Sequence, residues 1–175
     1  MKESESLLRE FKSGLGAHIS GCLESIESKV EIAGIGLFTD SDMSGFKLCI
    51  NSQEHLKNQN EIAESENDLL VNKWWIPEWW WESNNQEEES KLFGLLDAIS
   101  EALEFAIYKR TLFKVYCQVL KENAKQIASR NSNIVFLVQE SDNFDQDLHR
   151  EGLLLLLSDE QWEEYVRFNR YWSDV

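Results

Sequence analysis

The patterning of apolar residues along this 175-residue chain predicts an α+β fold, with helices packed on an antiparallel or mixed β-sheet. Segments with apolar residues at three- and four-residue spacing stand near both ends and in the middle, and shorter β-branched or alternating runs lie between them. Their order does not follow the strict strand–helix alternation of a doubly wound parallel fold. One proline, eight glycines and no internal repeat leave no linker, so a single domain over residues 1–175 is expected.

The N-terminal part of the chain predicts a helix and then a β-hairpin. An apolar stripe indicates a helix that covers much of residues 4–28, although interior glycines weaken it. Residues 30–39 and 46–50 have the composition of strands. Residues 40–45 connect them and favour a turn, because Asp and Ser side chains bond nearby backbone N–H groups and Gly45 accepts a positive φ.

The middle of the chain predicts mainly helices. Ser52 begins a short helix through Leu56, and the polar stretch after it is interpreted as a loop. Residues 84–90 are polar again. Apolar periodicity then marks two helices, one by Leu92, Leu96, Ile99, Leu103 and Ile107 and the other by Leu112, Tyr116, Val119, Leu120 and Ile127.

The C-terminal part predicts two strands and a helix. Residues 133–138 have the apolar, β-branched character of a buried strand, and the acidic turn 140–147 ends it. Gly152 opens a run of five leucines that is interpreted as another strand. A capping box over residues 158–161 then starts a last helix, which carries three aromatic residues on one side: Trp162, Tyr165 and Phe168.

Charge and composition favour a protein partner. Acidic residues outnumber basic ones 32 to 17, and the formal net charge is −15. A field of that sign repels nucleic acid and anionic lipid and attracts basic proteins, so neither nucleic acid nor a membrane is an expected partner. The alternative is that the charge merely keeps a tryptophan-rich protein soluble. The chain shows no signal-peptide pattern and no run of about 18 apolar residues, which predicts a cytoplasmic location.

Metal-binding patterns are incomplete. Asp40, Asp42, Ser44 and Gly45 match the first half of a calcium loop, but Asn51 stands at its twelfth position, where calcium needs a bidentate glutamate. A capped hairpin turn is the alternative that we favour. Glycine motifs that bind phosphate do not occur. The sequence therefore predicts no metal site and no cofactor.

Cysteines and histidines give no catalytic pattern. The three cysteines are odd in number, form no CxxC pair and are interpreted as buried thiols. His18, His55 and His149 follow no catalytic or metal-binding spacing and are expected at the surface or in an interface. A thiol–histidine pair formed only by folding stays open, and Cys49 with His55 is the first pair to inspect.

Tryptophan is concentrated in one segment: five of the seven lie within a stretch of eight residues. Exposed indoles stack on sugar rings or anchor a protein partner, because Trp combines a large rigid surface with one hydrogen-bond donor. Core filling is the alternative. Pro77 is predicted to start a short helical turn that directs Trp79 inward and leaves Trp80 and Trp81 partly outward. We expect Trp74 and Trp79 to be buried and the other tryptophans of the segment to be less so.

Several short motifs carry a resemblance to a known family. Residues 37–40 (LFTD), 51–56 (NSQEHL) and 73–82 (KWWIPEWWWE) resemble "LYTD", "NTEEHL" and "WSPAEW" with a following acidic residue in a bacterial family called domain of unknown function 4303. Residues 134–142 are similar to its late strand and acidic end, so the resemblance spans nearly the whole chain. Families of this kind, like immunity-protein families, are small, acidic and cytoplasmic. Membership implies no reaction and no catalytic residues.

The leading hypothesis is a non-catalytic, acidic cytoplasmic protein-binding module, specifically an immunity protein that neutralises a basic bacterial toxin. The alternative is a small hydrolase that acts on a carbohydrate or another small molecule in a cleft lined by Trp80, Trp81 and nearby carboxylates such as Glu78 and Glu82. Self-association into a homodimer, through the leucine run or the Trp172 helix, is compatible with both. The candidate partner-binding residues are Trp75, Trp80, Trp81, Glu78, Glu82, Asp40 and Asp42.

Overall fold

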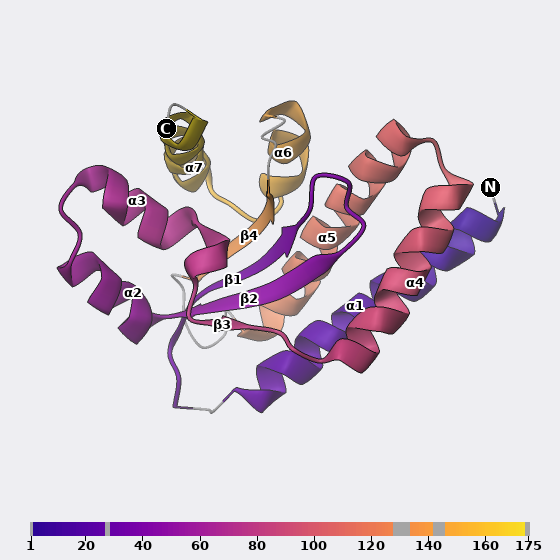
Figure 1. Cartoon of the computed structure of the whole chain (residues 1–175), viewed down its shortest axis with the longest axis horizontal. Helices are drawn as coiled ribbons and strands as arrows, with labels where there is room; N and C mark the ends of the chain where they lie inside the picture. Colours follow the sequence, from indigo (N-terminus) through magenta and orange to yellow (C-terminus); the bar gives the residue numbers. More distant parts are fainter. Residues whose placement is uncertain (1, 27–28, 128–133, 142–145, 174–175) are drawn as a thin grey trace.

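A computed structural model of the chain confirms the α+β architecture: a mixed sheet lies between two groups of helices (Figure 1). The structure describes residues 2–26, 29–127, 134–141 and 146–173. The strand order is β3-β2-β1-β4, where β1 is Ile32–Thr39, β2 is Phe46–Ser52, β3 is Trp81–Glu82 and β4 is Val135–Glu140. β1 pairs antiparallel with β2 and parallel with β4, and β3 pairs antiparallel with β2.

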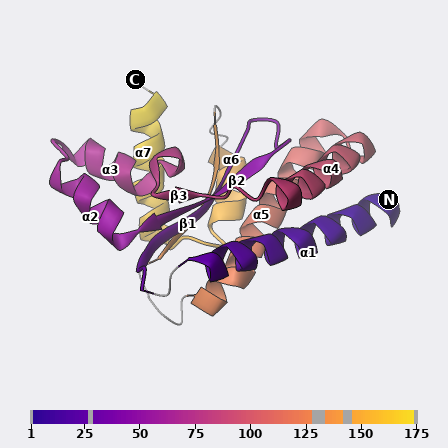
Figure 2. The same cartoon turned by 60° about the horizontal axis from the view of Figure 1, so that its bottom comes forward.

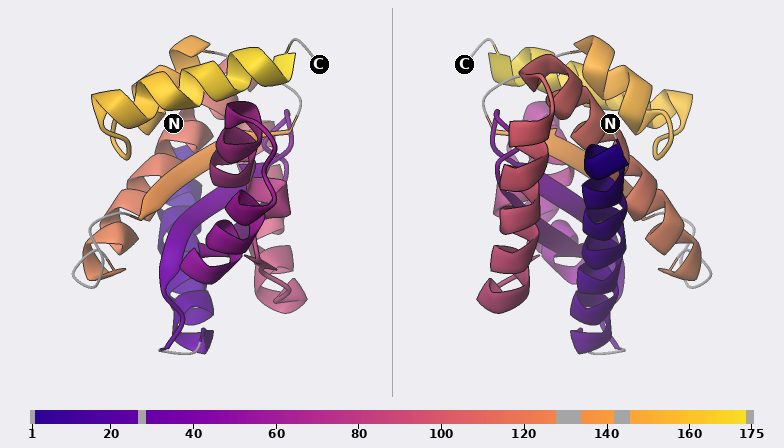
Figure 3. Two further views of the ribbon diagram at one scale, coloured as in Figure 1. Left: turned by 90° about the vertical axis from the view of Figure 1, so that its left-hand side faces the viewer. Right: turned by 90° about the vertical axis from the view of Figure 1, so that its right-hand side faces the viewer.

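One face of the sheet is covered by α1 (Lys2–Ser25), α4 (Gln86–Ala102) and α5 (Phe105–Ile127), as Figure 2 shows. The predicted stripe of α1 is buried at Phe11, Leu15 and Ile19. α1 and α4 run side by side (Figure 3, right). A Cβ at Gly14 would lie 2.8 Å from Cδ2 of Leu92, so the glycine that weakens α1 also permits its close packing on α4.

The opposite face carries the tryptophan segment, with α2 (Gln53–Glu61), α3 (Glu66–Trp74), the short 3₁₀ helix η1 (Ile76–Glu78) and α7 (Asp159–Ser173). Pro77 lies in the first turn of η1, as predicted. Ile76 and Trp79 pack directly on the backbone of β1: a Cβ at Gly36 would lie 2.5 Å from Ile76, and one at Gly34 would lie 2.9 Å from Trp79. The two glycines therefore provide the flat surface on which the segment rests.

The hairpin turn is present, but its left-handed residue differs from the prediction. Met43 has a φ of 57°, whereas no described glycine has a positive φ. The Met43 side chain is fully buried and its carbonyl oxygen accepts a 2.8 Å hydrogen bond from the Tyr108 hydroxyl of α5. Burial and this contact offset the backbone cost of the conformation.

The stretch interpreted as a loop after Leu56 is largely helical, so that prediction was wrong. α2 extends to Glu61, and α3 begins after Ser65 with a capping box in which Ser65 and Asp68 bond each other's backbone N–H groups. α4 likewise begins inside the polar stretch at Gln86, after the N-cap Asn85. The first turns of these helices are polar, and their N-cap side chains accept hydrogen bonds from N–H groups that have no partner within the helix.

The leucine run is not a strand, which corrects the prediction. α6 (Gln146–Leu153) occupies its start and turns follow. A Cβ at Gly152 would lie 2.6 Å from the Phe113 ring, so α6 packs closely on α5 at this glycine. Leu154 and Leu155 are exposed, whereas Leu153 and Leu157 are buried. Leu153 and Leu157 are four residues apart, the spacing that places two side chains on one side of a helical turn, and the Leu157 N–H bonds the Leu153 carbonyl. The many consecutive leucines had suggested a strand instead.

The last helix follows the prediction closely. Ser158 and Gln161 exchange the hydrogen bonds of a capping box, with Gln161 N donating to Ser158 Oγ at 3.2 Å. α7 lies across one end of the molecule next to α3 (Figure 3, left). Its predicted aromatic side is buried, and the Tyr165 ring lies 5.5 Å from the Trp74 ring. Within the tryptophan segment, Trp74 therefore packs against α7, while Ile76 and Trp79 lie on β1.

Candidate functional site

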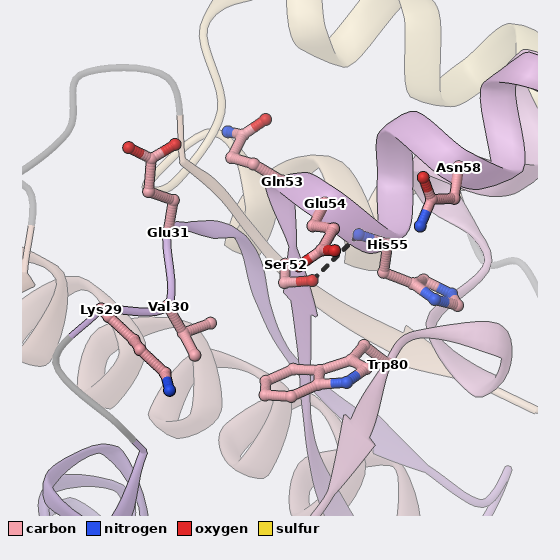
Figure 4. A pocket seen from close by; sticks show the side chains of 9 residues that line it. All are labelled: Lys29, Val30, Glu31, Ser52, Gln53, Glu54, His55, Asn58 and Trp80. Atoms are coloured by element: carbon pink, nitrogen blue, oxygen red, sulfur yellow. Dashed lines mark hydrogen bonds between the residues drawn. The ribbon is translucent and has the colours of Figure 1, made fainter.

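A groove of about 610 Å³ lies at one end of the sheet, where the connection between α1 and β1 meets the start of α2. Its walls are residues 29–31, residues 52–55 with Asn58, and the indole of Trp80 (Figure 4). Of the tryptophan side chains that the structure describes, Trp80 is the most exposed, at 44%. The groove is within the size range of ligand-binding clefts.

The first turn of α2 is fixed by local hydrogen bonds. Ser52 is the N-cap, and its hydroxyl accepts a 3.0 Å hydrogen bond from the His55 backbone N–H. The His55 Nε2 lies 3.2 Å from the carbonyl oxygen of Glu78. Because a carbonyl only accepts, Nε2 must carry the hydrogen and donate it. The His55 ring thus ties α2 to the tryptophan segment beside the groove.

Two carboxylates line the groove, and two more are close to the exposed indole in the sequence. Glu31 and Glu54 line the groove and are exposed. Glu78 and Glu82, two residues on either side of Trp80, are exposed as well. We call these four glutamates and Trp80 the Trp80 face. Lys29 is the cation that lines the groove, so the surface is predominantly anionic.

The structure brings together some of the predicted binding residues and separates others. Trp81 is half-buried in β3 and pairs with Ile50 beside the Trp80 face. Trp75 packs inward instead, with its ring 6.1 Å from Phe38 and 6.5 Å from Phe168.

Asp40 and Asp42 lie in the hairpin turn at the other end of β1. Since Ile35 pairs with Ile50, Asp40 is five residues from the level of Trp81, or roughly 17 Å along the strand. Asp40 accepts hydrogen bonds from the Ser44 backbone N–H and hydroxyl at 2.8 and 2.6 Å, which is the capped turn favoured above. These two aspartates therefore do not join the Trp80 face.

A buried polar cluster holds the segment that follows Trp80, and sequence analysis missed it. Ser83 donates a 2.5 Å hydrogen bond to Glu89 Oε1, and Lys47 Nζ lies 3.3 Å from Glu89 Oε2. His18 Nε2 lies 3.7 Å from the same carboxylate. Ser83 also accepts from the Leu48 N–H and donates its own N–H to the Leu48 carbonyl. The cluster fastens the end of β3 to β2 and α4.

The prediction that the histidines lie at the surface or in an interface does not hold for His18 and His149, which are buried within the chain. His18 and His149 are 2% and 1% exposed, and each contacts a buried glutamate, Glu89 and Glu140 respectively. The sequence gives no signal for such a partner, because Glu89 is far from His18 along the chain and Glu140 is nine residues from His149. His55, in contrast, is half-buried beside the groove.

The thiols are held in their protonated form. Burial, with a smaller contribution from Glu82, raises the pKa of Cys49 to about 12, and burial with Glu88 and Glu89 raises that of Cys22 to about 11. Burial also raises the pKa of Cys117. Thiolate is the nucleophilic form, so these groups are unreactive at neutral pH. The histidine that the structure places beside a thiol is His18, 3.8 Å from Cys22 Sγ.

The described residues contain no group of three His, Cys, Asp or Glu side chains that suits a metal ion. None of the described helices combines the length and the apolar character needed to cross a bilayer.

The fold and the groove define an acidic α+β protein with an open, indole-lined groove at one end of its sheet. The chain belongs to the family described as domain of unknown function (DUF4303), which matches residues 23–157. This match includes every wall of the groove and confirms the resemblance drawn from the short motifs. No curated protein and no solved structure matches the chain.

Proposed function

We propose that this protein is a non-catalytic bacterial binding protein of the cytoplasm, and specifically an immunity protein that binds and neutralises a basic toxin through its Trp80 face. The observation that carries the proposal is the exposed indole of Trp80 in a groove with carboxylates around it. Tryptophan is among the residues that contribute most to protein–protein affinity when a partner covers it.

Charge supports the same proposal both at long distance and at direct contact. The net charge of −15 attracts a basic partner from a distance and raises its rate of encounter. At contact, Glu31, Glu54, Glu78 and Glu82 offer only hydrogen-bond acceptors, which match the donors of lysine and arginine. Long-range attraction would set the association rate, and the indole would slow dissociation.

The test is co-purification with toxins encoded beside the gene, followed by binding kinetics of variants. We expect W80A to weaken the complex roughly 30-fold, chiefly by faster dissociation. We expect the E78K/E82K variant to associate about tenfold more slowly at low salt, with a smaller difference at high salt.

Two control variants alter similar side chains elsewhere. L155A removes an exposed apolar side chain after α6, and D97K/E101K reverses two exposed charges on α4. Both are expected to bind like the wild type. The proposal fails if no adjacent toxin binds, or if W80A and both controls behave alike.

The groove also favours a second candidate, because two carboxylates, Glu31 and Glu54, stand beside an indole as in sites that bind carbohydrate. In this alternative the protein is a small hydrolase in which a carboxyl group acts as general acid or base. The sequence predicted Glu78 and Glu82 as the carboxylates of this cleft, whereas Glu31 and Glu54 line the groove in the structure. Turnover of nitrophenyl glycosides or esters that is lost in E31Q or E54Q would establish the hydrolase and overturn the non-catalytic proposal.

A further inference from the structure

We infer that the groove beside Trp80 is a site for an arginine side chain of the partner, with the guanidinium on the face of the indole and paired with Glu31 or Glu54. The inference deepens the proposed function and rests on it for the biological source of the arginine. The site itself is defined by the groove and is testable without the partner.

The indole provides the stacking surface. Figure 4 shows the Trp80 ring along one side of the groove, across from the turn formed by Ser52 and His55. Nearly half of its surface is accessible, although Trp74 and Trp79 in the same segment are buried. A cation within about 6 Å of an indole face is attracted by the electron density of the ring, and tryptophan is the strongest of the aromatic side chains in this respect.

The polar groups of the groove select a donor-rich ligand. The Ser52 hydroxyl already accepts from the His55 N–H, and the His55 Nε2–H already donates to the Glu78 carbonyl. The remaining negative charge is on Glu31 and Glu54, whose oxygens only accept. Lys29 also lines the groove, and its positive charge lowers the affinity of the groove for a cationic ligand. The carboxylate acceptors remain in place.

Guanidinium fits this combination better than ammonium. It is planar, stacks on aromatic rings, is more weakly hydrated and presents a fork of N–H donors that matches a carboxylate. An ammonium group is compact and keeps its hydration more strongly. A groove of about 610 Å³ that is open to solvent admits the flat group together with its aliphatic stem.

The experiment is an NMR titration of the full chain with N-acetyl-arginine amide, N-acetyl-lysine amide and N-acetyl-norleucine amide. We expect the arginine amide to bind with a dissociation constant on the order of 10 mM, at least about threefold more tightly than the lysine amide, and the norleucine amide not to bind. The shifted signals should be the Trp80 indole N–H and the backbone amides of residues 52–58.

Variants of exposed residues separate the contributions. We expect W80F to retain part of the affinity and W80L to lose it, since phenylalanine keeps an aromatic face and leucine does not. E31Q or E54Q should weaken binding about threefold or more, and K29Q should strengthen it to a similar degree. E64Q, which changes an exposed glutamate between α2 and α3, is the matched control and should bind as the wild type.

Equal binding of all three amides, or undiminished binding by W80L, would overturn the arginine site. So would K29Q, E31Q and E54Q variants that all bind like the wild type. If the arginine amide binds as described but no toxin does, the site stands and the immunity proposal fails. If a toxin binds without dependence on an arginine of its own, the immunity proposal stands and the inference fails.

Discussion

Replacement of Gln139 by leucine is expected to lower the free energy of unfolding by about 2–6 kcal/mol, because two buried backbone groups would lose their partners. Gln139 lies in β4 and is 3% exposed. Its Oε1 accepts from the Ile76 N–H at 3.2 Å, and its Nε2 donates to the Trp74 carbonyl at 3.3 Å. One side chain thus satisfies the backbone at the point where α3 ends and η1 begins.

Urea denaturation followed by circular dichroism measures the effect. The Q139E variant keeps an acceptor for the Ile76 N–H but loses the donor to the Trp74 carbonyl when it is ionised, so it distinguishes the two bonds. Q118L is the control, since Gln118 is exposed on α5. A Q139L protein as stable as Q118L would show that the two hydrogen bonds contribute nothing net to the fold.

Removal of the Glu140 carboxylate is the second change with a large consequence. The side chain is completely buried at the end of β4, with Lys109 Nζ 2.6 Å from Oε2 and His149 Nε2 3.4 Å from Oε1. E140A would leave the mostly buried Lys109 ammonium without its partner. We expect a loss of about 3–5 kcal/mol, the usual cost of breaking a buried ion pair from one side.

A double variant tests whether the uncompensated charge of Lys109 causes the loss of stability. E140L/K109M replaces both charges by apolar groups, and we expect it to be more stable than E140A, because no buried charge is left uncompensated. E61A breaks the exposed Lys57–Glu61 pair on α2 and serves as the control with little change in the urea midpoint. If the double variant is less stable than E140A, desolvated charge is not the source of the loss.

Elements with a strong local pattern could be predicted from the sequence. The apolar stripes of α1, α4 and α5, the capping box of α7 and the strand composition of β1 and β2 were each present in a short window. The boundary between the two central helices was wrong: Ile107, predicted on the first of them, lies exposed on α5. The predicted burial of Trp74 and Trp79 is confirmed, and that of Trp79 was inferred from the turn that Pro77 starts. These features need no knowledge of distant residues.

Features that depend on distant partners could not be predicted. α3 is a nine-residue helix that is stabilised by its cap and by packing on α7, and it is too short for apolar periodicity to reveal it. The leucine run has the composition of a strand, but contact of Gly152 with Phe113 places it against α5. The Trp80 face could be predicted only in part, for the same reason. Glu78 and Glu82 are neighbours of Trp80 in sequence, whereas folding brings Glu31 and Glu54 to the groove that Trp80 lines.

Because α7 covers Trp74, a truncated form of this protein must keep α7 to remain folded. The family match ends at residue 157, two residues before α7 begins, and the buried stripe of α1 precedes residue 23. A polypeptide trimmed to residues 23–157 would expose the indole of Trp74 and the β-sheet surface beneath Phe11 to water. The portion shared among relatives is therefore smaller than the portion that must be expressed to obtain a folded product.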